Sequence, residues 1–163
     1  ANLGMVLCAG GDYFLQYIRR SPGKFTCGIL LFSLGHVCNL AALFLLAPFR
    51  PSALAVLAGL LALALALKGI GRWDTSENEP WLTIYIGLVA MTAAKSLSAA
   101  IAAPGAPGSL LLGLGGLLFF LSDIVLGIWN YQKNHILVAN LNWLLYFSGQ
   151  FLLCAGYIAS VSI

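Results

Sequence analysis

Long runs of apolar residues alternate along this chain with short clusters of charged, proline and glycine residues. A helix needs about 20 residues to cross a hydrocarbon core ~30 Å thick. Cutting the sequence at the clusters therefore predicts six membrane-spanning helices, of which the first is the shortest. They cover residues 2–18, 24–47, 52–70, 81–102, 109–131 and 137–160.

The composition agrees with this pattern. Of the 163 residues, 61% are hydrophobic and 8% are charged, and the mean hydropathy is +0.95. Eight basic and five acidic residues cannot cover the surface of a soluble domain, which is typically about a quarter charged. The predicted fold class is thus an all-α, polytopic transmembrane bundle, with residues 1–163 as a single domain of a multi-pass integral membrane protein. The net charge of +3 is scattered along the chain, which excludes a nucleic-acid partner.

The six predicted spans differ in character. Residues 52–67 are almost entirely Ala and Leu, so this span is expected to face lipid and to carry no chemistry. The other five spans each combine a polar residue with small residues, such as Gly11, Gly28 or Gly113, that permit close helix approach. These five are predicted to form the packed bundle.

Charge along the chain predicts the orientation. One set of helix ends carries most of the basic residues, and Arg50 lies at the opposite set, so the positive-inside rule places both chain ends outside the cytoplasm. The four tryptophans fall on the basic side, where an aromatic belt is expected. The basic residues of this side are Arg19, Arg20, Lys24, Lys68, Arg72 and Lys133.

Ionisable residues within the predicted spans include Asp12, His36, Lys95 and Asp123. A charge at the bilayer centre costs about 2.5–3.5 kcal/mol on insertion scales, so such residues are commonly functional. A structural explanation is the alternative, in which a carboxylate pairs with Lys95 or caps a helix.

Counting the helical rise from the basic side places the polar side chains at similar depths. Asp12 lies ~9 Å from that side, whereas Asp123 and Tyr146 lie ~12 Å and His36 and Gln150 ~18 Å from it. Lys95 lies deeper, at ~21 Å, and Tyr85 shallower, at ~6 Å. This layer predicts a polar cavity that opens toward the inner leaflet.

Two carboxyls in such a cavity suit acid–base hydrolysis, with one protonated and the other ionised. The sequence contains no Gly-x-Ser-x-Gly elbow and no His-Glu-x-x-His motif, so a serine hydrolase and a zinc peptidase have no support. Ser122 precedes Asp123 without forming a triad. The four cysteines stand singly, and no ligand spacing indicates a metal or another cofactor.

Several segments, taken in chain order, resemble a known family. They are GDYFL at 11–15, FSLGH at 32–36, Tyr85 with Met91, LFFLSDIVL at 118–126 and YFSGQ at 146–150. In this order and spacing they resemble the signature of the YhhN-like lysoplasmalogenase family, over nearly the whole chain. The stretch around Ser122-Asp123 and the Tyr-x-x-x-Gln ending are the most specific parts.

The resemblance implies an integral membrane enzyme that cleaves the vinyl ether bond of lysoplasmalogen, a lysophospholipid, to a fatty aldehyde and glycerophospho-ethanolamine or -choline. Members commonly have about eight spans, so an N-terminal helical hairpin is expected to be missing here. Asn39 stands where the family often has a tyrosine. The matching functional residues are Asp12, His36, Tyr85, Ser122, Asp123, Tyr146 and Gln150.

In the expected mechanism, Asp123 donates a proton and Asp12 stabilises the resulting cation or directs water, with the two roles open to exchange. His36, Tyr146 and Gln150 are expected to orient water, and Lys95 to hold the phosphate or keep one carboxylate ionised. The main alternative is a small proton-coupled transporter or lipid-binding membrane protein. A purely structural subunit is a third possibility.

Overall fold

Helices make up nearly all of the described chain. The computed structural model describes residues 2–15, 21–132 and 135–161. No strand occurs within these ranges, so the all-helical fold class is confirmed. The elements are α1 (Asn2–Leu15), α2 (Pro22–Leu46), α3 (Ser52–Gly71), the 3-10 helix η1 (Ser76–Asn78), α4 (Glu79–Ala102), α5 (Ser109–Tyr131) and α6 (Ile136–Val161).

The lengths of the helices suit a bilayer. Helices α2 to α6 are each 20 residues or longer and apolar enough to cross a membrane, which agrees with a multi-pass integral membrane protein. The described part of α1 has 14 residues and is therefore ~21 Å long, shorter than the hydrocarbon core. Its predicted end at residue 18 lies outside the described residues, as do Arg19, Arg20 and Lys133.

Prolines explain where two helices begin. Helices α2 and α4 start at residues 22 and 79, slightly before the predicted starts at 24 and 81. Pro22 and Pro80 lie in the first turns of these helices. The first turn accepts proline because the backbone N–H groups there have no intrahelical partner. Gly108 precedes α5 with a φ of +74°, and a Cβ there would lie 2.3 Å from the Gly156 carbonyl oxygen.

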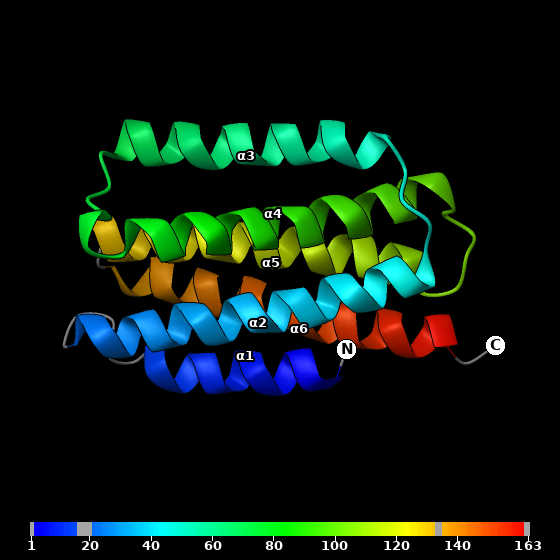
Figure 1. Ribbon diagram of the computed structural model, residues 1–163, viewed down its shortest axis with the longest axis horizontal. Coiled ribbons are helices and arrows are strands. Elements are labelled where there is room, and N and C mark those ends of the chain that lie inside the picture. The colour runs from blue at the N-terminus through cyan, green and yellow to red at the C-terminus, as the bar shows by residue number, and fades with distance from the viewer. Residues whose placement is uncertain (1, 16–20, 133–134, 162–163) are drawn as a thin grey trace.

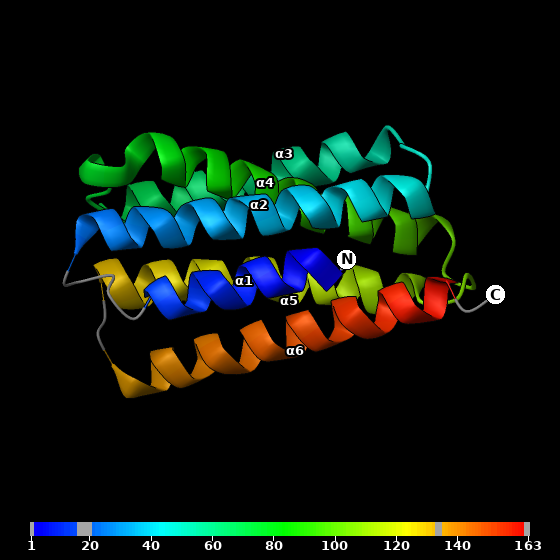
Figure 2. The same cartoon turned by 60° about the horizontal axis from the view of Figure 1, so that its bottom comes forward.

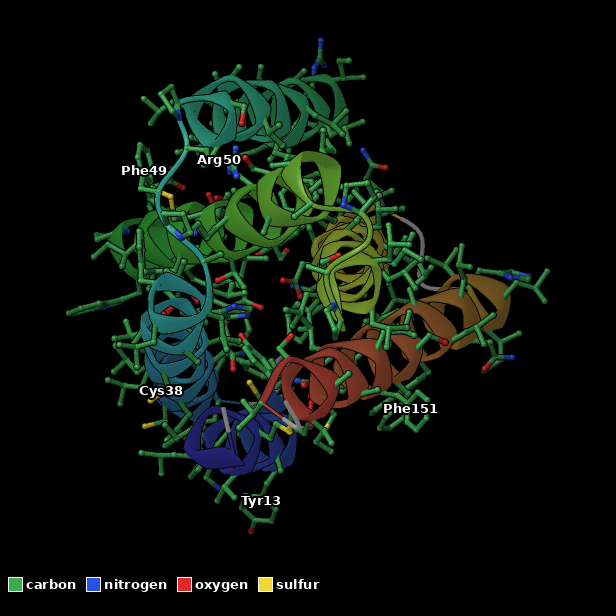
Figure 3. The ribbon with its side chains drawn as sticks, turned by 90° about the vertical axis from the view of Figure 1, so that its right-hand side faces the viewer. Tyr13, Cys38, Phe49, Arg50 and Phe151 are labelled. Carbon is green, nitrogen blue, oxygen red and sulfur yellow. The ribbon has the colours of Figure 1, made fainter. Side chains whose placement is uncertain are left out.

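Five helices surround the centre of the molecule, and α3 lies outside them (Figures 1 and 3). Around this ring, α1 packs on α2, α2 on α4, α4 on α5 and α5 on α6. In Figure 2, α1 lies between α2 and α6, and side-chain contacts between α1 and α6 complete the ring. Helix α3 packs mainly on α4, and Ala53 is its one buried residue. The predicted peripheral position of this helix is confirmed.

Glycines allow the helices of the ring to approach closely. A Cβ on Gly115 of α5 would lie 2.7 Å from the Leu153 backbone nitrogen of α6, and one on Gly149 of α6 would lie 2.8 Å from the Phe119 backbone nitrogen of α5. A Cβ on Gly11 of α1 would lie 2.5 Å from the Phe32 ring. Close packing of these backbones keeps the central side chains in fixed positions.

The helix ends gather at two ends of the bundle (Figure 1). The end of α1, the start of α2, the α3–α4 connection, the end of α5 and the start of α6 lie at one end, which we call the connection end. The end of α6 and the connections α2–α3 and α4–α5 lie at the opposite end, whereas α1 starts partway along the bundle. The predicted alternation of the spans is therefore confirmed.

Candidate functional site

A cavity of about 260 Å³ lies inside the bundle and reaches the connection end. The helices α1 to α6 all contribute to its wall, which is mainly apolar. The predicted residues on this wall are Asp12, Tyr85, Asp123 and Tyr146. The structure therefore brings both carboxyls to one cavity, as the sequence predicted.

Each carboxyl is held by a tyrosine from another helix. The Tyr146 hydroxyl of α6 donates to Asp12 Oδ2 of α1 at 2.7 Å, and the Tyr85 hydroxyl of α4 donates to Asp123 Oδ2 of α5 at 2.8 Å. Both carboxyls line the same cavity. Because both pairs bridge different helices, the position of each carboxyl depends on the packing of the whole ring.

Five rings form the deep end of the site, and we call them the aromatic floor. The Phe32 ring lies near both tyrosine rings, with centroid distances of 6.1 Å to Tyr85 and 6.3 Å to Tyr146. Phe119 packs against Tyr146 at 5.3 Å and against His36 at 4.8 Å. These contacts restrict the tyrosine rings and hence the directions of their hydroxyl groups. The floor consists of Phe32, His36, Tyr85, Phe119 and Tyr146.

His36 belongs to this floor but not to the cavity wall. Its side chain is fully buried, and its Nδ1 atom lies 3.1 Å from the Thr92 hydroxyl of α4. Thr92 was missed by the sequence reasoning, because a hydroxyl in an apolar helix usually bonds only to its own backbone. The predicted contact between His36 and the hydrolytic water remains a prediction.

Gln150 and Ser122 occupy different surroundings. Gln150 is partly buried and lies one helical turn after Tyr146 on α6. Ser122 is buried, and its hydroxyl donates to the Phe119 carbonyl of its own helix at 2.7 Å. The cavity wall does not include Ser122, so this hydroxyl has a local role in the structure.

Lys95 lies apart from both carboxyls. Its Nζ atom donates to the carbonyl oxygens of Ala47 at 2.7 Å and Pro48 at 2.9 Å, at the end of α2, and lies 5.1 Å from the centre of the Phe44 ring. A cation is favourable there because the last carbonyls of a helix carry partial negative charge. The structure therefore separates Lys95 from the cavity, contrary to the expectation that it holds a phosphate or pairs with an aspartate.

The connection end of the cavity carries polar groups that were not predicted to belong to the site. Lys68 forms a salt bridge with Glu79, which also accepts a hydrogen bond from Thr75. The Trp73 ring stacks on Tyr131 at 5.8 Å and an interplanar angle of 20°. Lys68, Trp73, Thr75 and Tyr131 all line the cavity, so a ligand there would meet charged and aromatic groups.

Asn142 links two walls of the same cavity. Its amide nitrogen on α6 donates to the Ser122 carbonyl oxygen on α5 at 2.7 Å. A helical count places Asn142 one turn before Tyr146 on the same face, which is the signal that could have identified it. Within the described ranges, no group of three or more His, Cys, Asp or Glu side chains could hold a metal ion.

Comparison with known proteins shows to which family the chain belongs. No curated protein and no solved structure matches the chain. The model of the YhhN family matches residues 2–157, which include both tyrosine–aspartate pairs. The match covers nearly the whole sequence, and the chain therefore belongs to the YhhN family.

Proposed function

We propose that the protein is a membrane-embedded hydrolase that cleaves the vinyl ether bond of lysoplasmalogen. The observation that carries the proposal is that Asp12 and Asp123, each bonded to a tyrosine, line one apolar cavity. Membership in the YhhN family supports it further. Two carboxyls facing one cavity suit a reaction that needs an acid and a stabilising base.

The reaction begins with protonation of the vinyl ether. Asp123, in its protonated form, gives its proton to the outer alkene carbon, and the electron pair of the double bond forms the new C–H bond. The carbon bonded to oxygen then becomes part of an oxocarbenium ion. Asp12, as a carboxylate, stabilises this positive charge. Tyr85 bonds to Oδ2 of Asp123, which leaves Oδ1 to carry the proton.

Water completes the cleavage. A water molecule adds to the oxocarbenium carbon and loses one proton to a carboxylate, giving a hemiacetal. Breakage of the bond between this carbon and the ether oxygen, with a proton passing to the leaving oxygen, yields the fatty aldehyde and the glycerol hydroxyl. Both carboxyls thus return to their starting states, and one water molecule is consumed.

The cavity suits an amphiphile with a single chain. Its volume of about 260 Å³ is below the roughly 300–1,000 Å³ of pockets that enclose a whole drug-sized ligand. The proposed position of the glycerol and vinyl ether is therefore inside the cavity, with the head group toward Lys68 and Trp73 at the connection end. The alkyl chain extends between the helices into lipid.

The decisive measurement is aldehyde release from synthetic lysoplasmalogen by the purified full chain. We expect Asp12→Asn and Asp123→Asn to lose at least 100-fold in kcat, because each removes a group that changes its charge or proton during the reaction. Glu77→Gln makes the same carboxyl-to-amide change in the exposed η1 segment and should retain wild-type activity.

The same assay distinguishes the alternatives. A transporter or a lipid-binding protein releases no aldehyde, so a wild-type chain that is folded and inactive contradicts the proposed function. A folded Asp123→Asn variant with full activity removes Asp123 from the role of donor.

A further inference from the structure

Two buried hydrogen-bond acceptors lie one helical turn apart on α2. In the described residues, the buried side-chain polar atoms without a hydrogen-bond partner are His36 Nε2, Asn39 Oδ1 and Trp73 Nε1. Trp73 lies at the connection end, whereas His36 and Asn39 are three residues apart and hence neighbours on one face of the helix. The exposed fractions of their side chains are 0% for His36 and 2% for Asn39.

The hydrogen bonds of Thr92 determine which nitrogen of His36 carries the proton. The Thr92 hydroxyl donates to the Leu88 carbonyl oxygen at 2.9 Å, and a hydroxyl has only one hydrogen to donate. At the 3.1 Å contact with His36 Nδ1, Thr92 is therefore the acceptor and Nδ1–H is the donor. In the neutral ring, Nε2 then carries a lone pair and can only accept a hydrogen bond.

Asn39 presents the second acceptor from the next turn. A Cβ on Gly4 of α1 would lie 2.8 Å from Asn39 Oδ1, so this oxygen faces the part of α1 that has no side chain. The Asn39 backbone carbonyl accepts a hydrogen bond from the Tyr157 hydroxyl of α6 at 3.0 Å. The side-chain oxygen thus lies in the interior where α1, α2 and α6 meet.

Both acceptors require a hydrogen donor. A buried polar group without a partner is unfavourable, because burial removes its hydrogen bonds to water. Two such groups lie here on neighbouring turns. A water molecule has two O–H groups, and buried waters typically bond to two to four polar groups that lack other partners.

We propose that a buried water molecule bridges His36 Nε2 and Asn39 Oδ1 and donates one hydrogen bond to each. Neither residue lines the cavity, so this site is distinct from the place where a substrate would bind. Asn39 is thereby a positioning residue, which acts on His36 through the water and keeps the imidazole neutral with Nε2 as an acceptor. The proposal does not depend on the proposed hydrolase function.

A crystal structure of the full chain in a lipid phase, at a resolution that shows ordered water, tests the site directly. We expect a density peak about 2.7–3.2 Å from both His36 Nε2 and Asn39 Oδ1. Direct contact between the Asn39 amide and Nε2, a metal ion at that point, or an absence of density there would each overturn the proposal.

Nitrogen-15 NMR of histidine-labelled protein gives a second test. In the wild type, we expect His36 Nε2 to show the shift of an unprotonated nitrogen that accepts a hydrogen bond, and His135 is the other histidine to be assigned. Asn39→Leu removes one acceptor of the bridge and should move the Nε2 resonance toward the position without a hydrogen bond.

Ser33→Ala serves as the matched control for this measurement. Ser33 lies on the same helix as Asn39, and its hydroxyl bonds to the Ile29 carbonyl oxygen, so the Nε2 resonance should stay at its wild-type position. An Nε2 resonance that is the same in Asn39→Leu and in the wild type contradicts the proposed bridge. If Asn39→Leu does not fold, the electron density between His36 Nε2 and Asn39 Oδ1 in the wild-type crystal structure tests the proposal.

Discussion

Each carboxyl of the site owes its position to one tyrosine hydroxyl. Tyr85 and Tyr146 are both buried, and both rings pack near Phe32. Each hydroxyl donates a hydrogen bond to Oδ2 of its aspartate. The two tyrosine hydroxyls therefore determine which carboxyl oxygen is engaged in a hydrogen bond during the proposed reaction.

Removing either hydroxyl should lower activity while the protein remains folded. We expect Tyr85→Phe and Tyr146→Phe to reduce kcat by roughly 10- to 100-fold, because a hydrogen bond to a charged group contributes about 1.5–3 kcal/mol. Steady-state aldehyde release measures the effect. Tyr13→Phe, on the exposed side of α1 (Figure 3), should keep wild-type kcat, and equal rates for all three variants would contradict the role of the pairs.

At the scale of the elements, glycines determine how the helices of the ring pack, because no side chain there separates the two backbones. Helices α5 and α6 approach so closely that a Cβ on Gly149 would meet the backbone of α5 at 2.8 Å. The adjoining helices carry Asp123 and Tyr146, so this contact also fixes the distance between the two halves of the site. In contrast, a Cβ on Gly87 of α4 would have nothing within 4 Å.

The different surroundings of Gly149 and Gly87 predict opposite effects of a glycine-to-alanine substitution at the two positions. Gly149→Ala should lower the free energy of unfolding by about 1–3 kcal/mol, because an added methyl group forces the two backbones apart. Gly87→Ala should be neutral or stabilising by up to about 1 kcal/mol, because alanine favours the helix. Thermal unfolding in detergent compares the two variants, and equal Tm values would contradict the proposed close contact.

At the scale of the whole molecule, the bundle has two different ends. The connection end carries Lys24, Lys68 and Arg72 of the described residues, and Arg50 lies at the opposite end. The cavity reaches the connection end, so the orientation of the protein decides from which side of the membrane the head group of a lipid would enter.

Cysteine labelling tests this orientation. In a variant without the four native cysteines, Ser76→Cys marks the connection end and Gly105→Cys marks the opposite end. The positive-inside rule predicts that a membrane-impermeant reagent labels Ser76→Cys from the cytoplasmic side and Gly105→Cys from the other side. Labelling of the two positions from the reversed sides would contradict the predicted orientation.

The sequence by itself determined the number, the approximate limits and the depth of the helices. Apolar runs of membrane length separated by proline and glycine leave few ways to place the spans. The rise along a helix then fixes the height of each side chain, which is why Asp12, Asp123 and Tyr146 were predicted in one layer. The peripheral position of the Ala- and Leu-rich span followed from its lack of polar groups.

Only the tertiary structure decided which side chains meet. Height along a helix does not fix its rotation or its neighbours, and these depend on how the helices pack against one another. For this reason Lys95 was expected near the carboxyls but bonds to the end of α2, and Ser122 bonds within its own helix. The partners Thr92 and Asn142 emerge for the same reason only once the helices are packed together.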